Sequence, residues 1–430
     1  MHSEEEILTV KDLSKIEGHA ELEVTVRGNK VKKAKLKVSE NKRFFIQASL
    51  GKQFSNVHQL VSRICGTCSM AHMFGSLEAV EYALGVKPSK QTLTLRRLAL
   101  NGVNIRDHAM HLYLFCLPDI YGKDSVLDFP DEGPLHDLIH KAFDVKAVGN
   151  KLSEITAGRA VHAPFPAVGG FVKLPKKEDL KQVAKDLMKV RDAAIEFVDI
   201  FDKSDFKFES ETQFVALTND NYDFINGEIT SSEGYCIPPF SYPRYLKRMV
   251  APYSQAPGFE FEGEPYMVGA LARMNMNSKG LHKDTKKDLK KYICKFPCTN
   301  VYHNNVAQAI EIVHCIDRSV ELIEKLELKD ERPPTIKPKA CEGVGAVEAP
   351  RGTLYYNYEI NSEGKIKHSD IVIPTSQNQI KMEKDLGGLV QDNLDKGVKK
   401  KEIIHNMETL IRAYDPCMSC ATHFLKVKWL

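Results

Sequence analysis

The chain has 430 residues, of which 43% are hydrophobic and 27% charged, and this balance is typical of a folded globular protein with a large core. The formal net charge is only +3 and the lysines are spread along the chain, which argues against nucleic acid as a partner. No stretch approaches the roughly 20 apolar residues of a membrane span, and the acidic start lacks the apolar segment of a secretory signal, so we expect a cytoplasmic protein with no direct membrane span.

The N-terminal region is predicted to form an antiparallel hairpin. Leu22, Val24 and Val26 alternate with polar residues, which is the pattern of a strand with one buried face. Gly28-Asn29 supplies a turn, and the stretch from Val31 to Val38 runs back along the first strand.

The middle of the chain is predicted to be helical. The stretch from Leu93 to Leu117 is apolar at helical spacing and should end before Pro118, because proline lacks the N–H that a helix interior requires. Similar spacing predicts further helices over residues 177–202, 306–326, 381–394 and 401–414.

A second hairpin is predicted near the C-terminus, with strands over 354–360 and 366–373. Loops are predicted over 203–265 and 329–350, where Pro, Gly, Asn and Asp gather. We therefore predict an α+β, predominantly helical fold. One large helical domain would span residues 1–430, flanked by small antiparallel sheets from the N- and C-terminal regions.

Two cysteine pairs carry the candidate chemistry. Cys65 and Cys68 form a C-x-x-C pair near the start of the chain, and Cys417 and Cys420 form another near its end. Two thiols at this spacing, on a turn that enters a helix, can point at one metal ion. Together the pairs would form a four-thiolate site for a soft or borderline metal.

A structural zinc ion is the alternative occupant of such a site. About 350 residues separate the two pairs, whereas zinc ribbons and fingers usually keep their halves far closer. Each pair is also followed by a histidine, His72 or His423, which structural zinc with four thiolates would not need. Both features favour another metal.

The two cysteine motifs, R-x-C-G-x-C-x-x-x-H and D-P-C-x-x-C-x-x-H, resemble the paired signatures of nickel–iron ([NiFe]) hydrogenase large subunits. The resemblance continues along essentially the whole chain in shorter segments: Lys15-Ile-Glu17-Gly-His19, Arg106-Asp107-His108, Gly158-Arg159, Pro265–Gly269, Asn304-Asn305, Ala349-Pro350-Arg351-Gly352 and Ile373-Pro374-Thr375. The segments HLYLFCLPD and GGFVKLP are most similar to the cytoplasmic sulfhydrogenase and NAD(P)- or deazaflavin-linked group. The resemblance implies a catalytic subunit that reversibly oxidises dihydrogen to protons and electrons.

The resemblance also implies roles for the four cysteines. All four would bind nickel, with Cys65 and Cys417 as terminal ligands and Cys68 and Cys420 as bridges to iron. Carbon monoxide and cyanide would complete the coordination of the iron. This Ni-Fe centre is the cofactor that the resemblance predicts.

Three further residues receive catalytic roles from the resemblance. Glu17 would relay a proton, because the pKa of a carboxyl beside a thiolate can be tuned towards the working pH. Arg351, beside Pro350 and Asp107, would hold its guanidinium over the open side of the metals. The structural alternatives are a residue at the start of the first strand for Glu17, a surface turn for Arg351 and a helix-face salt bridge for Asp107.

The two histidines after the cysteine pairs also have implied roles. His72 would donate a hydrogen bond to a bridging sulfur, with a buried core histidine as the alternative. His423 would bind a magnesium-type ion and would become the last residue once a protease removes the extension 424–430, which could instead be a short final strand. Ile46 stands where the family usually has a glutamate ligand for that ion, so Gln47 or water would have to replace it. Ser62 is another departure, since an acidic or amide residue usually precedes the arginine.

Electrons would leave through an iron–sulfur small subunit, because no further cluster motif remains in the sequence. A further subunit for an NAD(P)-, deazaflavin- or ferredoxin-linked carrier, a maturation protease and nickel-insertion proteins are also implied partners. The alternative function is a non-catalytic, zinc-stabilised scaffold related to the complex I homologue. That relative generally lacks the four cysteines.

Overall fold

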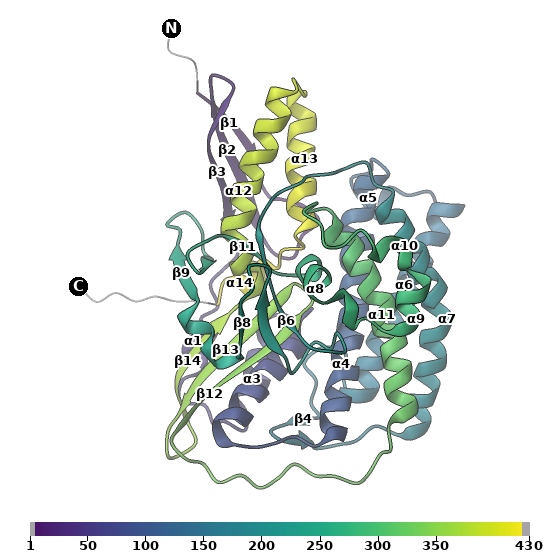
Figure 1. Ribbon diagram of the computed structural model, residues 1–430, viewed down its shortest axis with the longest axis vertical. Coiled ribbons are helices and arrows are strands. Elements are labelled where there is room, and N and C mark those ends of the chain that lie inside the picture. The colour runs from purple at the N-terminus through teal and green to yellow at the C-terminus, as the bar shows by residue number, and fades with distance from the viewer. Residues whose placement is uncertain (1–4, 424–430) are drawn as a thin grey trace, which may run out of the picture.

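Four long helices form one side of the molecule. The computed structural model describes residues 5–423, and it places α4 (Lys90–Met110), α6 (Pro134–Ala157), α7 (Lys177–Asp202) and α11 (His303–Lys325) side by side (Figure 1). The helices predicted over 177–202 and 306–326 are confirmed, the second with a slightly earlier start.

The backbones of α4 and α6 touch where each helix has a glycine. A Cβ atom at Gly102 would lie 2.7 Å from the carbonyl oxygen of Gly149, and a Cβ at Gly149 would lie 2.8 Å from the amide nitrogen of Arg106. Neither position therefore has room for a larger side chain. This close packing fixes the part of α4 that carries Arg106, Asp107 and His108.

The prediction that the helix after Leu93 ends before Pro118 is wrong. The chain passes through one π-helical stretch, His111–Cys116, and continues into α5 (Leu117–Ile120). Pro118 lies in the first turn of α5, where no helical N–H donor is needed.

The N-terminal strands form a sheet that packs on two C-terminal helices, and together they project from the rest of the molecule. β1 (Glu5–Val10), β2 (Ala20–Arg27) and β3 (Lys30–Val38) are antiparallel, and the hairpin predicted here is confirmed. The sheet packs on α12 (Pro374–Asp395) beside α13 (Lys400–Ala413), at the top of Figure 1. The N-terminal and C-terminal regions therefore build this projecting part together.

The C-terminal sheet has three antiparallel strands, β12 (Cys341–Ala349), β13 (Gly352–Ile360) and β14 (Ile366–Val372). The predicted hairpin of β13 and β14 is confirmed, but the loop predicted over 329–350 is wrong for β12. Gly343 and Gly345 resemble loop residues in the sequence, yet they lie where α3 (Ser69–Leu84) packs directly on the strand. The sequence pattern does not reveal that contact.

The loop predicted over 203–265 is also wrong in part, because it contains short strands. β6 (Gln213–Thr218) pairs with β7 (Glu228–Ser231), which pairs with β8 (Cys236–Ile237), and β6 also pairs in parallel with β11 (Tyr266–Met267). β9 (Leu246–Val250) and β10 (Pro257–Phe261) form a separate hairpin. These strands bury a second apolar cluster against β12 and β13.

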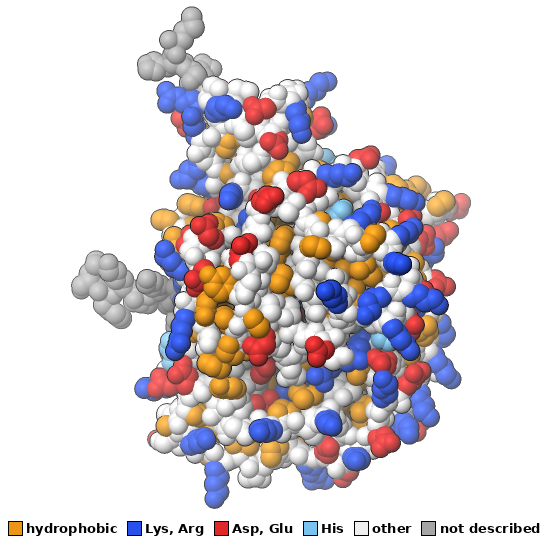
Figure 2. Space-filling model, in the orientation of Figure 1, with side chains coloured by type: hydrophobic (Ala, Val, Ile, Leu, Met, Phe, Trp, Pro, Cys, Tyr) orange, Lys and Arg blue, Asp and Glu red, His pale blue; other side chains and the backbone are white. Residues whose placement is uncertain are grey.

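The remaining elements are short: α1 (Phe45–Ser49), α2 (Val57–Val61), β4 (Pro166–Ala167), β5 (Gly170–Phe171), α8 (Ala270–Asn277), α9 (Lys283–Asp288), α10 (Lys290–Ile293) and α14 (Met418–Ala421). The predicted α+β, predominantly helical fold is confirmed. In the described part of the chain, no helix combines the length and apolarity needed to cross a membrane. Figure 2 shows basic and acidic side chains interspersed over the visible face.

The contact between α3 and β12 can be tested by a glycine-to-alanine substitution, which adds one methyl group to the strand. A Cβ at Gly345 would clash with the backbone of Gly75 and Ala79, so we expect Gly345→Ala to lower the free energy of unfolding by about 1–3 kcal/mol. Gly387→Ala, inside α12, is the matched control, because a Cβ at Gly387 would lie an ordinary 3.5 Å from the Cβ of Ala34. The control should be neutral or stabilising by about 0.5–1 kcal/mol. Denaturant unfolding measures both variants, and equal stabilities would contradict the close contact.

Candidate metal centre

Two loops from opposite ends of the sequence bring four thiols together. Cys65 follows a 3-10 turn and Cys68 caps α3, whereas Cys417 and Cys420 belong to the turn that forms α14. The four sulfur atoms lie within 4.8 Å of one another and all are buried. Within residues 5–423 this is the one such cluster of metal-ligating side chains.

The spacing of the sulfur atoms is that of a ligand set rather than of disulfides. The Sγ atoms of Cys65 and Cys417 are 3.4 Å apart, those of Cys68 and Cys420 are 3.1 Å apart, and those of Cys417 and Cys420 are 2.9 Å apart. A disulfide requires about 2.05 Å. The four sulfurs therefore face a common point.

Burial and mutual hydrogen bonds shift the pKa values of the four thiols in different directions. Hydrogen bonds from Cys417 and the other two thiols lower the pKa of Cys65, whereas burial raises the pKa of Cys417 and of Cys420 well above its usual range. A coordinated metal cation would favour the thiolate form of each cysteine. Four buried sulfur donors suit a soft or borderline metal such as nickel.

Two arginines hold the cysteine loops in place. The Nη2 atom of Arg43 donates to the carbonyl oxygens of Ile64 and Ser419, at 2.6 Å each, and so joins the two loops. Arg106 donates to the carbonyl oxygen of Thr67, between the first two cysteines. Sequence reasoning missed this role for both arginines, because a basic residue beside a motif is indistinguishable from a surface charge.

Glu17 lies beside the cluster, in the loop between β1 and β2. Its Oε2 atom is 3.0 Å from the Sγ atom of Cys417 and accepts a hydrogen bond from the amide of Ser419 at 3.0 Å. Gly18 has φ +82°, and a Cβ there would lie 2.8 Å from the Cβ of Met418, so the loop can approach only with glycine at this position. The side chain of Glu17 is half-buried.

Arg351 lies on the other side of the cluster, in the turn between β12 and β13. Its guanidinium donates to Asp107 at 2.5 Å and to Asp415 at 2.8 Å. All three side chains are buried, and burial raises the pKa of Asp107 although the positive charge of Arg351 opposes this. The enclosed cavity at the cysteines is lined by Arg351, and Pro350 is next to it in the same turn. Asp415 belongs to the second cysteine motif, but the motif alone does not indicate this partnership.

His72 bridges a cysteine and a tyrosine. Its Nε2 atom is 3.6 Å from the Sγ atom of Cys420, and its Nδ1 atom is 2.7 Å from the hydroxyl of Tyr356. If the hydroxyl donates to Nδ1, Nε2 carries the proton and points at the sulfur. Sequence reasoning missed Tyr356, because an apolar position in an alternating strand gives no signal of a polar contact.

His423 lies behind the cluster, and both of its ring nitrogens face main-chain carbonyls. Nδ1 is 2.8 Å from the oxygen of Cys420 and Nε2 is 3.1 Å from the oxygen of Ile371. Ile46 is buried in α1 and offers no ligand atom. A magnesium-type ion at His423 therefore stays a prediction.

Comparisons with known proteins agree with this geometry. The chain matches the family model described as nickel-dependent hydrogenase over residues 47–128 and 144–423. It is 32% identical to the alpha subunit of sulfhydrogenase 2 from Pyrococcus furiosus, over 98% of this chain and 100% of that relative. It is 30% identical to one subunit of the F420-non-reducing hydrogenase from Methanothermobacter thermautotrophicus, over 97% of this chain and 94% of that relative.

A solved structure of an NAD+-reducing nickel–iron hydrogenase in the H2-reduced state has the same fold. The TM-score is 0.84 at 22% sequence identity, and the match covers 97% of this chain and 99% of the other. At this identity the likeness supports the fold alone.

The four-sulfur geometry predicts that Cys417→Ser removes the metal without unfolding the chain. Serine is a harder and far less acidic ligand, so we expect nickel content to fall to a small fraction of the wild-type value while the unfolding transition remains cooperative. Cys315→Ser is the matched control, because Cys315 is equally buried but lies in α11 away from the cluster. Metal analysis and thermal unfolding measure the two properties. Retained nickel in Cys417→Ser would show that this sulfur is not a ligand.

Proposed function

The chain belongs to the nickel-dependent hydrogenase family, and we propose from this premise how the residues of this large subunit hold the nickel–iron centre and move protons. The main supporting observation is the convergence of four buried thiols, with Glu17 3.0 Å from the Sγ atom of Cys417 and Arg351 lining the same cavity as Cys68, Cys417 and Cys420. Metal analysis of the purified complex tests it, with about one nickel per chain and iron beyond that of partner clusters as the expected result.

All four cysteines would hold nickel in this proposal. Cys68 and Cys420 would also bridge to iron, while Cys65 and Cys417 would be terminal ligands. The bound centre supplies the Lewis acidity and the electron transfer needed to split dihydrogen. Iron would carry carbon monoxide and cyanide, for which the cavity lined by Arg351, Leu354 and Pro374 supplies both a cation and apolar walls.

Glu17 would carry the proton between the cluster and the surface. A proton on the Sγ atom of Cys417 can pass to Oε2 of Glu17 across 3.0 Å, which is within hydrogen-bonding reach. The hydrogen bond from the amide of Ser419 fixes the carboxylate in this orientation. Because Glu17 is half-buried, its outer side is open to exchange with solvent.

Arg351 would provide a fixed positive charge at the open side of the centre. Asp107 and Asp415 each accept from a different nitrogen of its guanidinium, so the planar group has a defined orientation. A charge fixed in this way stabilises negative charge that develops during the reaction without any rearrangement.

Electrons would leave through a partner protein. The described residues contain one convergent group of metal ligands, and the proposed nickel–iron centre uses all of it. An iron–sulfur small subunit is therefore required, and a further subunit would bind the soluble electron carrier. Relatives include the alpha subunit of a sulfhydrogenase and the beta subunit of the NAD-reducing hydrogenase HoxS, which are named as subunits of larger assemblies.

The alternative of a non-catalytic zinc scaffold is not favoured. The family match and the four convergent cysteines both support a hydrogenase. Removal of an extension after His423 by a maturation protease stays a prediction, because residues 424–430 lie outside the described part of the chain.

Glu17→Gln should keep the metals but block proton movement. The amide preserves the shape of the side chain but cannot accept and release the proton, so we expect hydrogen/deuterium exchange to fall by about 100-fold or more. Glu23→Gln is the control, because Glu23 lies in β2, a few residues after the Glu17 loop, and pairs with Lys35 and Lys37 instead of a cysteine. An unchanged exchange rate in Glu17→Gln, with nickel intact, would assign Glu17 a purely structural role.

Arg351→Lys should lower hydrogen turnover about tenfold or more although the positive charge is kept. Lysine has a single mobile ammonium group and cannot pair with Asp107 and Asp415 in the geometry of the planar fork. The matched control is Arg191→Lys, because Arg191 on α7 makes a comparable two-nitrogen contact with Asp317 on α11 instead of with residues beside the cysteines. Turnover per bound nickel is the measurement, and wild-type turnover in Arg351→Lys would overturn the role of Arg351.

A further inference from the structure

A second buried arginine, Arg273 on α8, binds the backbone of the turn that carries Arg351. Its Nη1 atom donates to the carbonyl oxygen of Ala349 at 3.0 Å, and its Nη2 atom donates to that of Pro350 at 2.9 Å. These are the two carbonyls directly before Arg351. Arg273 is only 3% exposed, so solvent does not compete for these bonds.

Two buried carboxylates balance the charge of Arg273. Glu311 accepts from its Nε atom at 2.6 Å and from its Nη2 atom at 2.7 Å, and Glu348 accepts from its Nη1 atom at 2.7 Å. Glu348 also accepts from the amide of Leu217 at 2.7 Å and from the hydroxyl of Thr353 at 2.6 Å. Glu348 and Thr353 flank the Arg351 turn, so the ion pair and the turn form one unit.

Glu311 connects this unit to α4, the helix that carries Asp107, the partner of Arg351. It lies 2.8 Å from the Nε2 atom of His108 and accepts from the hydroxyl of Tyr222 at 2.7 Å. His108 directly follows Asp107, which binds Arg351. The positive charge of Arg273 overcomes the effect of burial and lowers the pKa of Glu311 to about 2. One ionised carboxylate therefore ties together the segments that carry Arg351 and Asp107.

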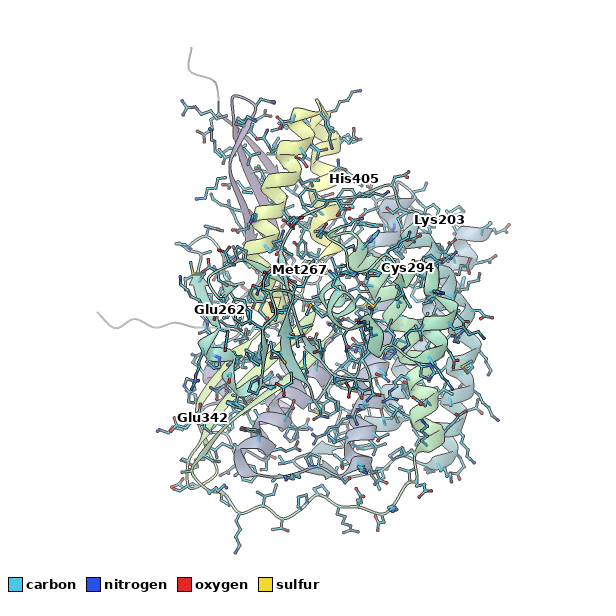
Figure 3. The ribbon with its side chains drawn as sticks, viewed as in Figure 1. Lys203, Glu262, Met267, Cys294, Glu342 and His405 are labelled. Carbon is cyan, nitrogen blue, oxygen red and sulfur yellow. The ribbon has the colours of Figure 1, made fainter. Side chains whose placement is uncertain are left out.

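The backbone beside the turn is equally constrained. Gly352 has φ +128°, and a Cβ there would lie 2.6 Å from the side chain of Val268 and 2.9 Å from the amide nitrogen of Gly269. Met267, labelled in Figure 3, lies on the strand that leads through Val268 and Gly269 into α8. Asn304 accepts from the amide of Leu271 at 2.9 Å and so anchors the first turn of α8. The segments around 265–269 and 304 that matched the family thereby support the turn.

We propose that Arg273 is a positioning residue for the reaction. It fixes the position of the Arg351 guanidinium by binding the carbonyls of Ala349 and Pro350. Through Glu311 and His108 it also fixes the position of Asp107. The inference rests on the role proposed above for Arg351. Arg273 itself does not contact the cysteines. A substitution of Arg273 must therefore have little effect on turnover once Arg351 has been replaced.

A double-mutant cycle tests this dependence. Arg273→Lys leaves a point charge that cannot span two carboxylates and two carbonyls, so we expect turnover per nickel to fall about 10- to 100-fold, as a small misplacement of a catalytic group can produce. In the Arg351→Lys background the same change should have little further effect. Equal fold losses in both backgrounds would overturn the inference.

The infrared bands of the iron's diatomic ligands give a second readout that does not depend on turnover. A displaced Arg351 alters the field at these ligands, so Arg273→Lys should shift their bands in the direction seen with Arg351→Lys. Arg96→Lys is the matched control, since Arg96 is also 3% exposed and makes a bidentate pair, with Glu81, plus a bond to a carbonyl. It should lose stability without any band shift.

The outcomes separate the inference from the proposed function. Absence of such bands in wild-type enzyme, or wild-type turnover in Arg351→Lys, would overturn the proposed centre or the role of Arg351, and the inference with it. Bands that shift in Arg351→Lys but not in Arg273→Lys would overturn the inference alone. If Arg273→Lys cannot be purified, Tyr222→Phe removes one bond to Glu311, and the inference then requires a smaller shift in the same direction. No shift in Tyr222→Phe would overturn it.

Discussion

The structure depends on one electrostatic constraint, the enclosure of four thiols within 4.8 Å of one another in a buried site. Four thiolates in such a place repel one another and lose their hydration, so they can coexist only around a cation. Two of the thiols belong to the start of α3 and two to the last described turn, α14. Metal binding and the joining of the two chain ends are therefore coupled steps, because neither pair of cysteines alone completes the ligand set.

The surroundings of the cluster follow from this constraint. Three arginines near it are each fixed by at least two acceptors: Arg43 by two carbonyls, Arg106 by two carbonyls and Arg351 by two carboxylates. Buried charges without partners would be strongly destabilising, and these acceptors reduce that cost. Arg273, Glu311 and Glu348 form a separate buried ion-pair network, which reaches the Arg351 turn through the carbonyl oxygens of Ala349 and Pro350.

The sequence was sufficient to predict which residues lie at the cluster. It was insufficient to predict which residues hold them in place. The two cysteine pairs, Glu17 and Arg351 were identifiable because a short local motif surrounds each of them. Tyr356 and Arg273 were not, because their partners lie 284 positions and 77 positions away in the sequence, respectively. The fold shows the same division: amphipathic helices such as 177–202 were predicted from local periodicity, but β12 depends on contact with α3 through Gly343 and Gly345. Periodicity describes which face of an element is buried and not what covers that face.

The side chains around the cysteines differ in what their surroundings permit. His72 is enclosed, with Tyr356 on one ring nitrogen and Cys420 on the other, so it can orient a hydrogen bond but has no second route for a proton. Arg351 is enclosed as well, and a guanidinium stays charged at any working pH. Glu17 is half-buried and contacts Cys417 on its inner side. Of these three residues, Glu17 is the one that is not fully buried. For this reason the proposed proton path runs through Glu17, in the loop that Gly18 brings close to Met418.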